Sequence, residues 1–276
     1  MISSTSSRDI HPTAIVHPRA VLGEGVRIGP YAIIEGPAVI GAGCTIAAHA
    51  IITGYVRMGE NNSVGYGAII GGDPQDNAFD PATESWVVIG SHNRIREYVT
   101  IHRGTTPGSE TRVGNHCFLM GGVHLAHNVI VEDRVILANN ALLAGHVQIG
   151  AGVFVGGSAV FHQFVRIGRN AVIQGNASIG KDVPPFLIGC RTNRVGGINT
   201  IGLRRAGLSA AQRQEIKRAF LLLYKSGLNT TQALAAAREQ TWSELGETFF
   251  RFVAESKKRG ICELRSSRNG GEDGED

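Results

Sequence analysis

The chain has 276 residues and a formal net charge of +4, and 42% of its residues are hydrophobic, which is enough to bury a sizeable core. It contains no run of about 18 apolar residues, and its first residues lack the apolar stretch of a secretion signal, so we expect neither a transmembrane segment nor export. The four cysteines lie far apart, at Cys44, Cys117, Cys190 and Cys262. They predict free thiols in a cytoplasmic protein.

Charge is unevenly distributed along the chain. Residues 1–185 contain 12 Lys and Arg against 13 Asp and Glu, whereas residues 186–276 contain 15 against 10. All ten histidines lie in the first of these parts. The basic last third indicates either an acidic partner or a solvated helical face.

An aliphatic residue recurs every six positions after a polar segment, 1–9, that we expect to be disordered. The series is unbroken from Ile10 to Ile70, resumes at Ile89 and continues to Ile179. No helix has a period of six, but a short strand plus a turn does, and three such units make a triangular coil of about 18 residues. The pattern predicts an all-β solenoid, a parallel β-helix, over residues 10–190.

Two segments interrupt the six-residue pattern, near 73–86 and near 102–112. Both are rich in Pro, Gly, Asp and Thr, which is typical of loops. Because loops that interrupt a rigid scaffold usually serve binding or assembly, we expect a functional role for these two insertions.

The pattern stops at Pro184-Pro185, and residues 191–265 are typical of a small α-helical C-terminal domain. A capping box at Ser209 predicts the start of one helix, and two more are expected near 231–240 and 246–258. We expect these helices to cover the end of the solenoid and the polar tail, 266–276, to be disordered.

Three histidines carry the candidate chemistry. His127 and His146 are 19 residues apart, and His162 follows 16 residues later, so coils of about 18 residues place all three on one edge of the prism. Such a row could bind zinc through neutral imidazoles, or it could supply one imidazole as a general base acting on a hydroxyl group. The spacing leaves both possibilities open.

Motifs between the hexads resemble one family. The residues that carry the likeness are His-x-x-His-Asn (124–128), Ala-Gly-His (144–146), His-Gln-Phe (162–164), Asp-Val-Pro-Pro (182–185), Ile-Arg-Glu-Tyr-Val-Thr-Ile-His-Arg-Gly (95–104) and Leu-Ala-Asn-Asn (137–140). From about Ile10 to Leu264 the chain resembles the acyl-carrier-protein-dependent UDP-N-acetylglucosamine O-acyltransferases of lipid A biosynthesis, within the hexapeptide-repeat acyltransferase superfamily.

The resemblance implies a left-handed β-helix that assembles as a homotrimer, with active sites in clefts between subunits. It implies transfer of a (3R)-3-hydroxyacyl chain from acyl carrier protein to the 3-hydroxyl of UDP-N-acetylglucosamine, without a cofactor, a metal or nucleic acid. His127 matches the general base, Asn128 can orient that ring, and the Gly145 N–H matches the oxyanion donor. Gly175 falls where the family sets acyl length, with room for a longer chain. The implied substrate-binding residues are Gln75, Asp76, His124, His146, His162, Gln163, Asn199 and Arg205.

Two positions depart from the family pattern. Asn128 stands where Asp is common, and Ala78 replaces a lysine that is common three places after Gln75. Because both changes alter the acceptor pocket, an N-acyltransferase of the same fold is an alternative, acting on a 3-amino UDP-sugar or on the later UDP-3-O-acylglucosamine. A zinc hydratase and a non-enzymatic β-helix with an ice-binding face are more distant alternatives, and the second needs a regular threonine array that the hexads lack.

Overall fold

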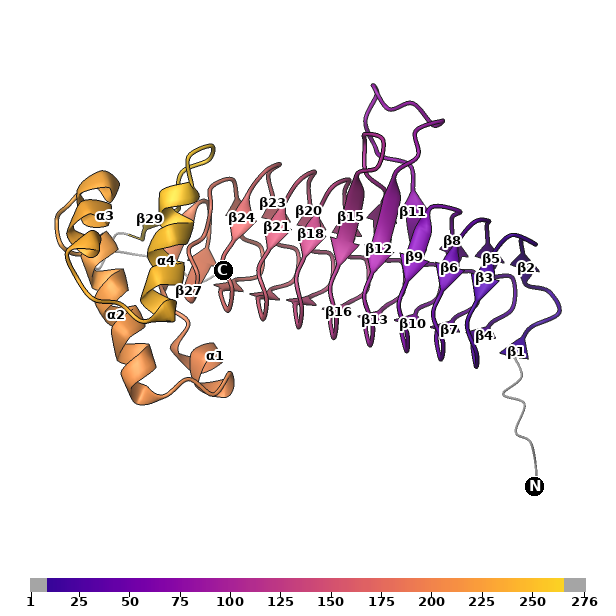
Figure 1. The fold of residues 1–276 in the computed structure, drawn as a ribbon, viewed down its shortest axis with the longest axis horizontal. Helices are drawn as coiled ribbons and strands as arrows, with labels where there is room; N and C mark the ends of the chain where they lie inside the picture. The colour runs from indigo at the N-terminus through magenta and orange to yellow at the C-terminus, as the bar shows by residue number, and fades with distance from the viewer. Residues whose placement is uncertain (1–8, 266–276) are drawn as a thin grey trace, which may run out of the picture.

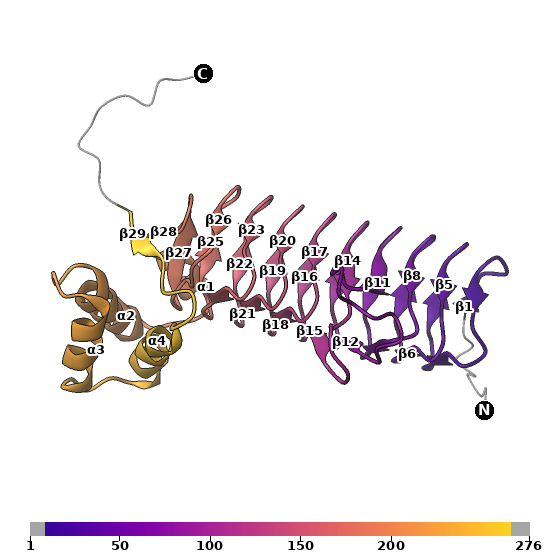
Figure 2. The same cartoon turned by 90° about the horizontal axis from the view of Figure 1, so that it is seen from above.

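The structure is a computed structural model that describes residues 9–265. The chain winds as a left-handed parallel β-helix, and four helices gather at one end of it (Figures 1 and 2). The expectations for residues 1–8 and 266–276 lie outside the described residues. Asp9, which we expected to be disordered, begins strand β1 and pairs with Arg27 of the next coil.

Each face of the prism is one sheet of short strands. The first sheet contains, in spatial order, β1 (Asp9–Ile10), β4 (Arg27–Ile28), β7 (Thr45–Ile46), β10 (Ser63–Val64), β13 (Arg94–Ile95), β16 (Phe118–Leu119), β19 (Ile136–Leu137), β22 (Phe154–Val155), β25 (Val172–Ile173), β27 (Leu187–Cys190), β28 (Arg194–Ile198) and β29 (Glu263–Leu264). The second contains β2 (Ile15–Val16), β5 (Ile33–Ile34), β8 (Ile51–Ile52), β11 (Ile69–Gly72), β14 (Thr100–His102), β17 (His124–Leu125), β20 (Leu142–Leu143), β23 (Val160–Phe161) and β26 (Ser178–Ile179). The third contains β3 (Val21–Leu22), β6 (Val39–Ile40), β9 (Val56–Met58), β12 (Trp86–Ile89), β15 (Glu110–Val113), β18 (Ile130–Val131), β21 (Gln148–Ile149) and β24 (Arg166–Ile167).

The register of the strands confirms the coil length and locates both insertions. In regular coils the paired residues are 18 apart, as in Arg27 and Thr45. The separation grows to 31 where Ser63 pairs with Arg94, and to 24 where Arg94 pairs with Phe118. The inserted loops are shorter than we expected, because Trp86 already belongs to β12 and residues 110–112 belong to β15.

The hexad residues form the core. Ile34, Ile52 and Leu125 are fully buried inside the prism, and Ala32 and Ala50 fill its corners. Burying one such aliphatic side chain contributes about 1.5–3 kcal/mol, and every coil repeats this contribution. The stacked coils also pair the backbone of each strand with its neighbours above and below.

The C-terminal region is not purely helical, in contrast to our expectation for residues 191–265. Strand β28 folds back antiparallel on β27, and β29 then pairs with β28, so the first sheet extends into this region. The six-residue repeat predicts only parallel pairing between successive coils. It therefore gives no signal for the antiparallel pairing of β28 with β27.

The helices cover the end of the solenoid (Figure 1). They are α1 (Thr200–Arg205), α2 (Ala210–Tyr224), α3 (Thr230–Arg238) and α4 (Glu244–Glu255). The capping box at Ser209 is confirmed, and Phe249 and Leu203 join the same buried cluster as the last coils. Helix α1 was not expected, since six residues are too few to show an amphipathic period. Within residues 9–265 no helix is both long and apolar enough to cross a membrane.

Candidate active site

One edge of the prism collects both insertions and the histidine motifs. This edge lies between the second and third sheets, and we call its turns at 73–85, 103–109, 126–129, 144–147 and 162–165 the histidine edge. The two inserted loops project from it beside β11, β12 and β15 (Figure 1). The sequence therefore predicted correctly that His127, His146 and His162 share an edge.

His127 is oriented by Asn128. Its Nδ1 lies 3.0 Å from the Asn128 Oδ1, which also accepts hydrogen bonds from the backbone N–H of Thr105 at 3.2 Å and from the Thr105 hydroxyl at 3.0 Å. A backbone N–H can only donate, so the amide atom facing Thr105 and His127 is the oxygen. The Nδ1 of His127 therefore carries the ring proton, and its Nε2 is left with a free lone pair. This is the arrangement that a general base requires.

The ring of His127 lies against Gly145 of the next coil. A Cβ atom at position 145 would stand 2.4 Å from Cε1 and 2.6 Å from Nε2 of that ring, so only glycine allows this approach. In the described chain the Gly145 N–H donates to no protein acceptor. The base and an unused backbone donor thus lie side by side, as acyl transfer requires.

His146 is part of a stack of rings. It meets His127 edge-on, with ring centroids 5.3 Å apart, and it stacks on Phe164 at 4.6 Å. The Lys258 ammonium lies over the ring of Phe164, 3.4 Å from its centroid. Burial lowers the pKa of His146, and the nearby charges of His127 and Lys258 act in the same direction. This ring is therefore suited to act as a neutral partner.

His124 belongs to a second histidine pair at the same edge. Its Nδ1 lies 2.8 Å from the Thr100 hydroxyl, and its ring meets His102 edge-on at 5.1 Å. His102 in turn contacts the backbone oxygen of Asp73 at the start of the first insertion. Burial lowers the pKa of His124, and His102 adds to the shift. We had not assigned a role to His102.

Arg103 holds the first insertion on the prism. Its side chain is only 3% exposed, and it donates to Asp73 Oδ1 at 2.9 Å and to the backbone oxygens of Pro81 and Thr83. Tyr55 lies under the same guanidinium. The loop that it holds carries Gln75 and Asp76, both exposed to solvent at the histidine edge. Asp76 also accepts from the Ala78 N–H at 2.9 Å, which closes a tight turn.

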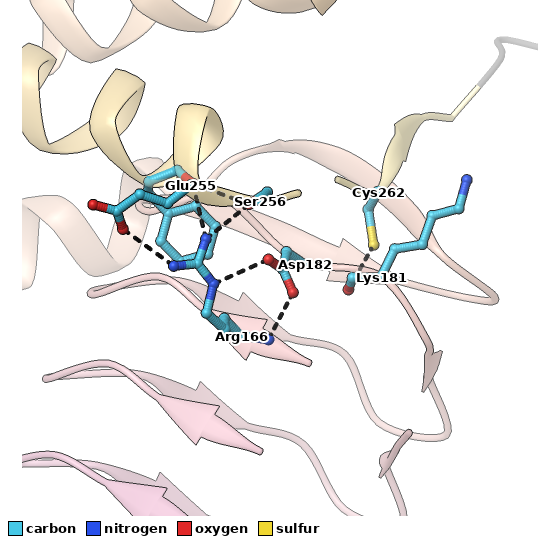
Figure 3. Close-up of polar contacts among 7 residues, drawn as sticks. Arg166, Lys181, Asp182, Glu255, Ser256 and Cys262 are labelled. Atoms are coloured by element: carbon cyan, nitrogen blue, oxygen red, sulfur yellow. Dashed lines mark hydrogen bonds and ion pairs between the residues drawn. The ribbon is translucent and has the colours of Figure 1, made fainter. Parts of the chain in front are cut away.

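The end of the histidine edge is closed by the segment after α4. Arg259 reaches His162, with 2.7 Å between Nη2 and Nδ1. Gln163, beside it, is exposed. Arg166 fixes this segment: it donates to the Phe252 backbone oxygen at 2.9 Å, to Ser256 at 3.0 Å and to Asp182 at 3.1 Å (Figure 3).

Three expected site residues lie away from the histidine edge of the same chain. Gly175 is exposed in a turn between the first and second sheets. Asn199 caps α1, accepting from the Gly202 N–H at 3.0 Å and donating to the Asn170 backbone oxygen at 2.9 Å. Arg205 is exposed in the last turn of α1. Within one chain these residues do not join the histidines.

No group of three or more His, Cys, Asp and Glu side chains in residues 9–265 is arranged to hold a metal ion. The histidines line up along an edge and do not converge on one point, so the zinc alternative has no ligand set there. All four cysteines are buried free thiols, as expected.

Comparison with known proteins gives consistent matches. Residues 182–262 match the family described as UDP N-acetylglucosamine O-acyltransferase, domain 2, and residues 19–54, 110–145 and 146–181 match the bacterial transferase hexapeptide family. An acyl-[acyl-carrier-protein]–UDP-N-acetylglucosamine O-acyltransferase of Janthinobacterium sp. is 43% identical over 91% of this chain and 98% of its own length. The enzyme of the same name from Gloeothece citriformis is 46% identical, but the match spans only 62% of that protein's length. The solved structure of LpxA from Acinetobacter baumannii is 39% identical over 93% of this chain and 99% of that one, with a TM-score of 0.85.

Proposed function

This chain belongs to the family of acyl-[acyl-carrier-protein]–UDP-N-acetylglucosamine O-acyltransferases. From that premise we propose that it transfers a (3R)-3-hydroxyacyl chain from acyl carrier protein to the 3-hydroxyl of UDP-N-acetylglucosamine. This reaction is the first step of lipid A biosynthesis. The observation that carries the proposal is the free Nε2 of His127 beside the unused N–H of Gly145. A base next to an oxyanion donor suits attack of a hydroxyl group on a thioester.

The reaction follows from these two groups. The His127 Nε2 removes the proton of the sugar 3-hydroxyl as its oxygen attacks the thioester carbon. The carbonyl oxygen becomes an oxyanion, which accepts a hydrogen bond from the Gly145 N–H; such a donor contributes about 10²–10³ in rate. The tetrahedral intermediate then collapses, the carbon–sulfur bond breaks, and the imidazolium of His127 returns its proton to the leaving thiolate. The Asn128 Oδ1 accepts from the Nδ1–H of His127 throughout, so only Nε2 gains and loses a proton.

The remaining expected residues divide between the two substrates. Gln75 and Asp76, on the loop that Arg103 holds, are placed to meet the sugar, and Arg205 offers a planar guanidinium to the diphosphate. His124, His146, His162 and Gln163 line the edge on either side of the base. Asn199 already makes two hydrogen bonds within its own chain, which leaves one amide N–H for the nucleotide.

A homotrimer would complete the site. The outward face of the second sheet is apolar, and its exposed residues include Ile15, Ile69, Leu142 and Val160. Such a face is typical of an interface between subunits. It is flanked on one side by the histidine edge and on the other by the turns that carry Gly175. Three copies packed through this face around a common axis would bring the edge that carries Gly175 in one copy against the histidine edge of another, with the Gly175 turn about three coils further along the solenoid than His127.

An acidic carrier protein fits the charge of the C-terminal region. A groove between α4 and the third sheet, close to the segment that reaches the histidine edge, has three arginines and two glutamates among its lining residues: Arg166, Arg169, Arg251, Glu132 and Glu255. Positive side chains here would attract an acidic helix and guide its acyl arm towards the site. We place the reaction in the cytoplasm, where free buried thiols remain reduced.

The test is to incubate the chain with UDP-N-acetylglucosamine and a mixed pool of 3-hydroxyacyl carrier proteins and to determine the mass and linkage of the product. We expect an ester at the 3-position. An amide formed only with a 3-amino UDP-sugar, and no product from UDP-N-acetylglucosamine, would refute the proposal.

The base is tested by His127→Ala. We expect turnover to fall by about 10²–10⁴ while the fold is kept, because a general base contributes that much. His92→Ala is the matched control, since His92 is an exposed turn histidine that stacks on His116 away from the histidine edge. Near-normal turnover of His127→Ala would show that His127 is not the general base.

A further inference from the structure

The contact between Arg259 and His162 fixes where the ring proton of His162 lies. A guanidinium carries only hydrogen-bond donors and stays charged, so at 2.7 Å the His162 Nδ1 has to be the acceptor. The neutral ring then carries its proton on Nε2. The Gln163 backbone oxygen also lies 3.3 Å from Nδ1. That oxygen can only accept, so it forms no hydrogen bond with a nitrogen that is itself an acceptor. The shorter contact, to Arg259, therefore determines that Nδ1 is unprotonated.

His162 is therefore the converse of His127. In His127 the proton is on Nδ1 and Nε2 is free to accept; in His162 Nε2 is the donor. The turns that carry the two rings lie on opposite sides of Gly145. His127 packs on Gly145 from the preceding coil, and the turn of His162 follows on the other side, where the Phe164 N–H donates to the Gly145 backbone oxygen at 3.1 Å.

The segment that presents Arg259 is held at both ends. At its start, Arg166 binds the Phe252 backbone oxygen and Ser256; at its end, the Asp182 N–H donates to the Gly260 oxygen at 2.9 Å and the Cys262 N–H donates to the Asp182 oxygen at 2.8 Å. Asp182 is 2% exposed and its carboxylate also binds Arg166, so one buried group links the two ends (Figure 3). The backbone that presents Arg259 to His162 is therefore held in place.

We propose that Arg259 is a positioning residue that sets the tautomer of His162 and so makes the His162 Nε2–H a hydrogen-bond donor to a carbonyl oxygen of the acyl donor. This inference rests on the proposed acyl transfer for its substrate. We assign the acyl donor to His162 because the thioester oxygen would lie at the Gly145 N–H, and the turn of His162 adjoins Gly145 on the side opposite His127.

The ring nitrogens provide a direct test without substrate. In protein carrying ¹⁵N-labelled histidine, the NMR signals of the His162 ring nitrogens are assigned by their absence in His162→Gln. We expect these signals to show a protonated Nε2 and an unprotonated Nδ1. Arg259→Met keeps the length of the side chain but removes its donors, and we expect a mixture of tautomers. Arg259→Lys restores a donor and should recover the original pattern. Lys257→Met is the matched control, because Lys257 is an exposed neighbour whose side chain makes no contact with His162.

Kinetics then separate positioning from general support of the fold. We expect Arg259→Met to raise KM for the acyl carrier protein substrate about twofold to fivefold, with a smaller change in kcat, because only the fraction of rings that carry the proton on Nε2 can donate to the carbonyl oxygen. His162→Ala removes the donor itself and should raise KM about tenfold, and the double variant should be no worse than His162→Ala alone. An unchanged His162 pattern in Arg259→Met, or additive losses in the double variant, would overturn the proposal. Failure of the proposed function would instead appear as absent acylation in the wild-type chain with the nitrogen pattern intact.

Discussion

His127 and His162 hold their ring protons on opposite nitrogens because their Nδ1 atoms face groups of opposite kind. An amide oxygen, shared with Thr105, faces the first, and a guanidinium faces the second. The protonation pattern of each ring is therefore decided by a neighbouring side chain and not by the imidazole itself.

Thr105 is the partner that fixes the Asn128 amide, so Thr105→Val should weaken the base without removing it. The variant loses one of the two hydrogen bonds that Thr105 donates to the Asn128 Oδ1, and it keeps the bond from the backbone N–H. We expect kcat to fall about threefold to tenfold, which corresponds to one neutral hydrogen bond. Steady-state kinetics provide the measurement, with Thr106→Val in the same loop as control. Equal kcat for both variants would show that Asn128 does not depend on Thr105.

The lowered pKa of His124 predicts a pH dependence of stability. Burial disfavours the charged ring in the folded chain, so between pH 6.5, its ordinary pKa, and the lower folded pKa the unfolded state binds more protons. The contribution of His124 to the free energy of unfolding is therefore fully present above pH 6.5, and it decreases as the pH falls below that value. Urea unfolding at one fixed protein concentration should show a flatter decrease for His124→Gln than for the wild-type chain. The same slope for both proteins would contradict this origin of the pH dependence.

At the scale of elements, the two insertions are loops whose place the sequence predicts better than their attachment. The hexad phase resumes after each interruption, so coil counting already puts both loops on the edge of His127. Arg103 fastens the first loop, and in the sequence it is one residue of the 95–104 motif with no pattern that indicates this role. Its partners at Asp73, Pro81 and Thr83 lie 20 to 30 residues earlier, within an aperiodic segment.

Arg103→Met should release this loop. The variant leaves the backbone oxygens of Pro81 and Thr83 without their donor, while the coils on either side keep their own backbone pairing. We expect faster proteolytic cleavage within 73–85 and an increase in KM for UDP-N-acetylglucosamine of about tenfold, with little change in the unfolding transition. Arg94→Met is the control, because that guanidinium also lies over an aromatic ring, Phe118, but on the first sheet. A loop that stays protected in Arg103→Met would show that other contacts hold it.

The sequence predicts features that follow from local repetition, and it does not predict contacts between distant residues. Period six fixes the β-helix, its core at residues such as Ile52, and the shared edge of His127 and His146, because each follows from local repetition. Helix α2 follows from its capping box. The contact of Arg259 with His162 joins residues 97 apart with no periodic relation, and the antiparallel return of β28 depends on where the coil ends. Neither has a local signal.

At the scale of the whole molecule, the apolar outward face of the second sheet predicts assembly. Leu142 is 44% exposed on this face and lies in the coil after His124. Leu142→Glu should leave the coil intact, because the side chain points outward, but should place three carboxylates in the interface of a trimer. We expect light scattering to report smaller particles and activity to fall with them. Leu221→Glu, at an exposed position of α2, is the control. A trimer that persists in Leu142→Glu would place the interface on another face.

Because Gly175 and His127 lie on different edges of one chain, a role of Gly175 in acyl length requires two subunits at each site. A Cβ at position 175 would lie 3.2 Å from the Gly157 backbone oxygen and 3.7 Å from the Gly157 nitrogen, so Gly175→Met should fold with a small local shift while its side chain enters the space for the acyl chain. We expect the variant to prefer shorter hydroxyacyl chains in a chain-length panel. When it is coexpressed with His127→Ala, mixed trimers contain sites that pair an intact His127 from one subunit with an intact Gly175 from the other. Such sites should restore transfer of the long chain, which neither variant performs alone. If mixed trimers form but do not transfer the long chain, the two residues do not belong to one site at a subunit boundary.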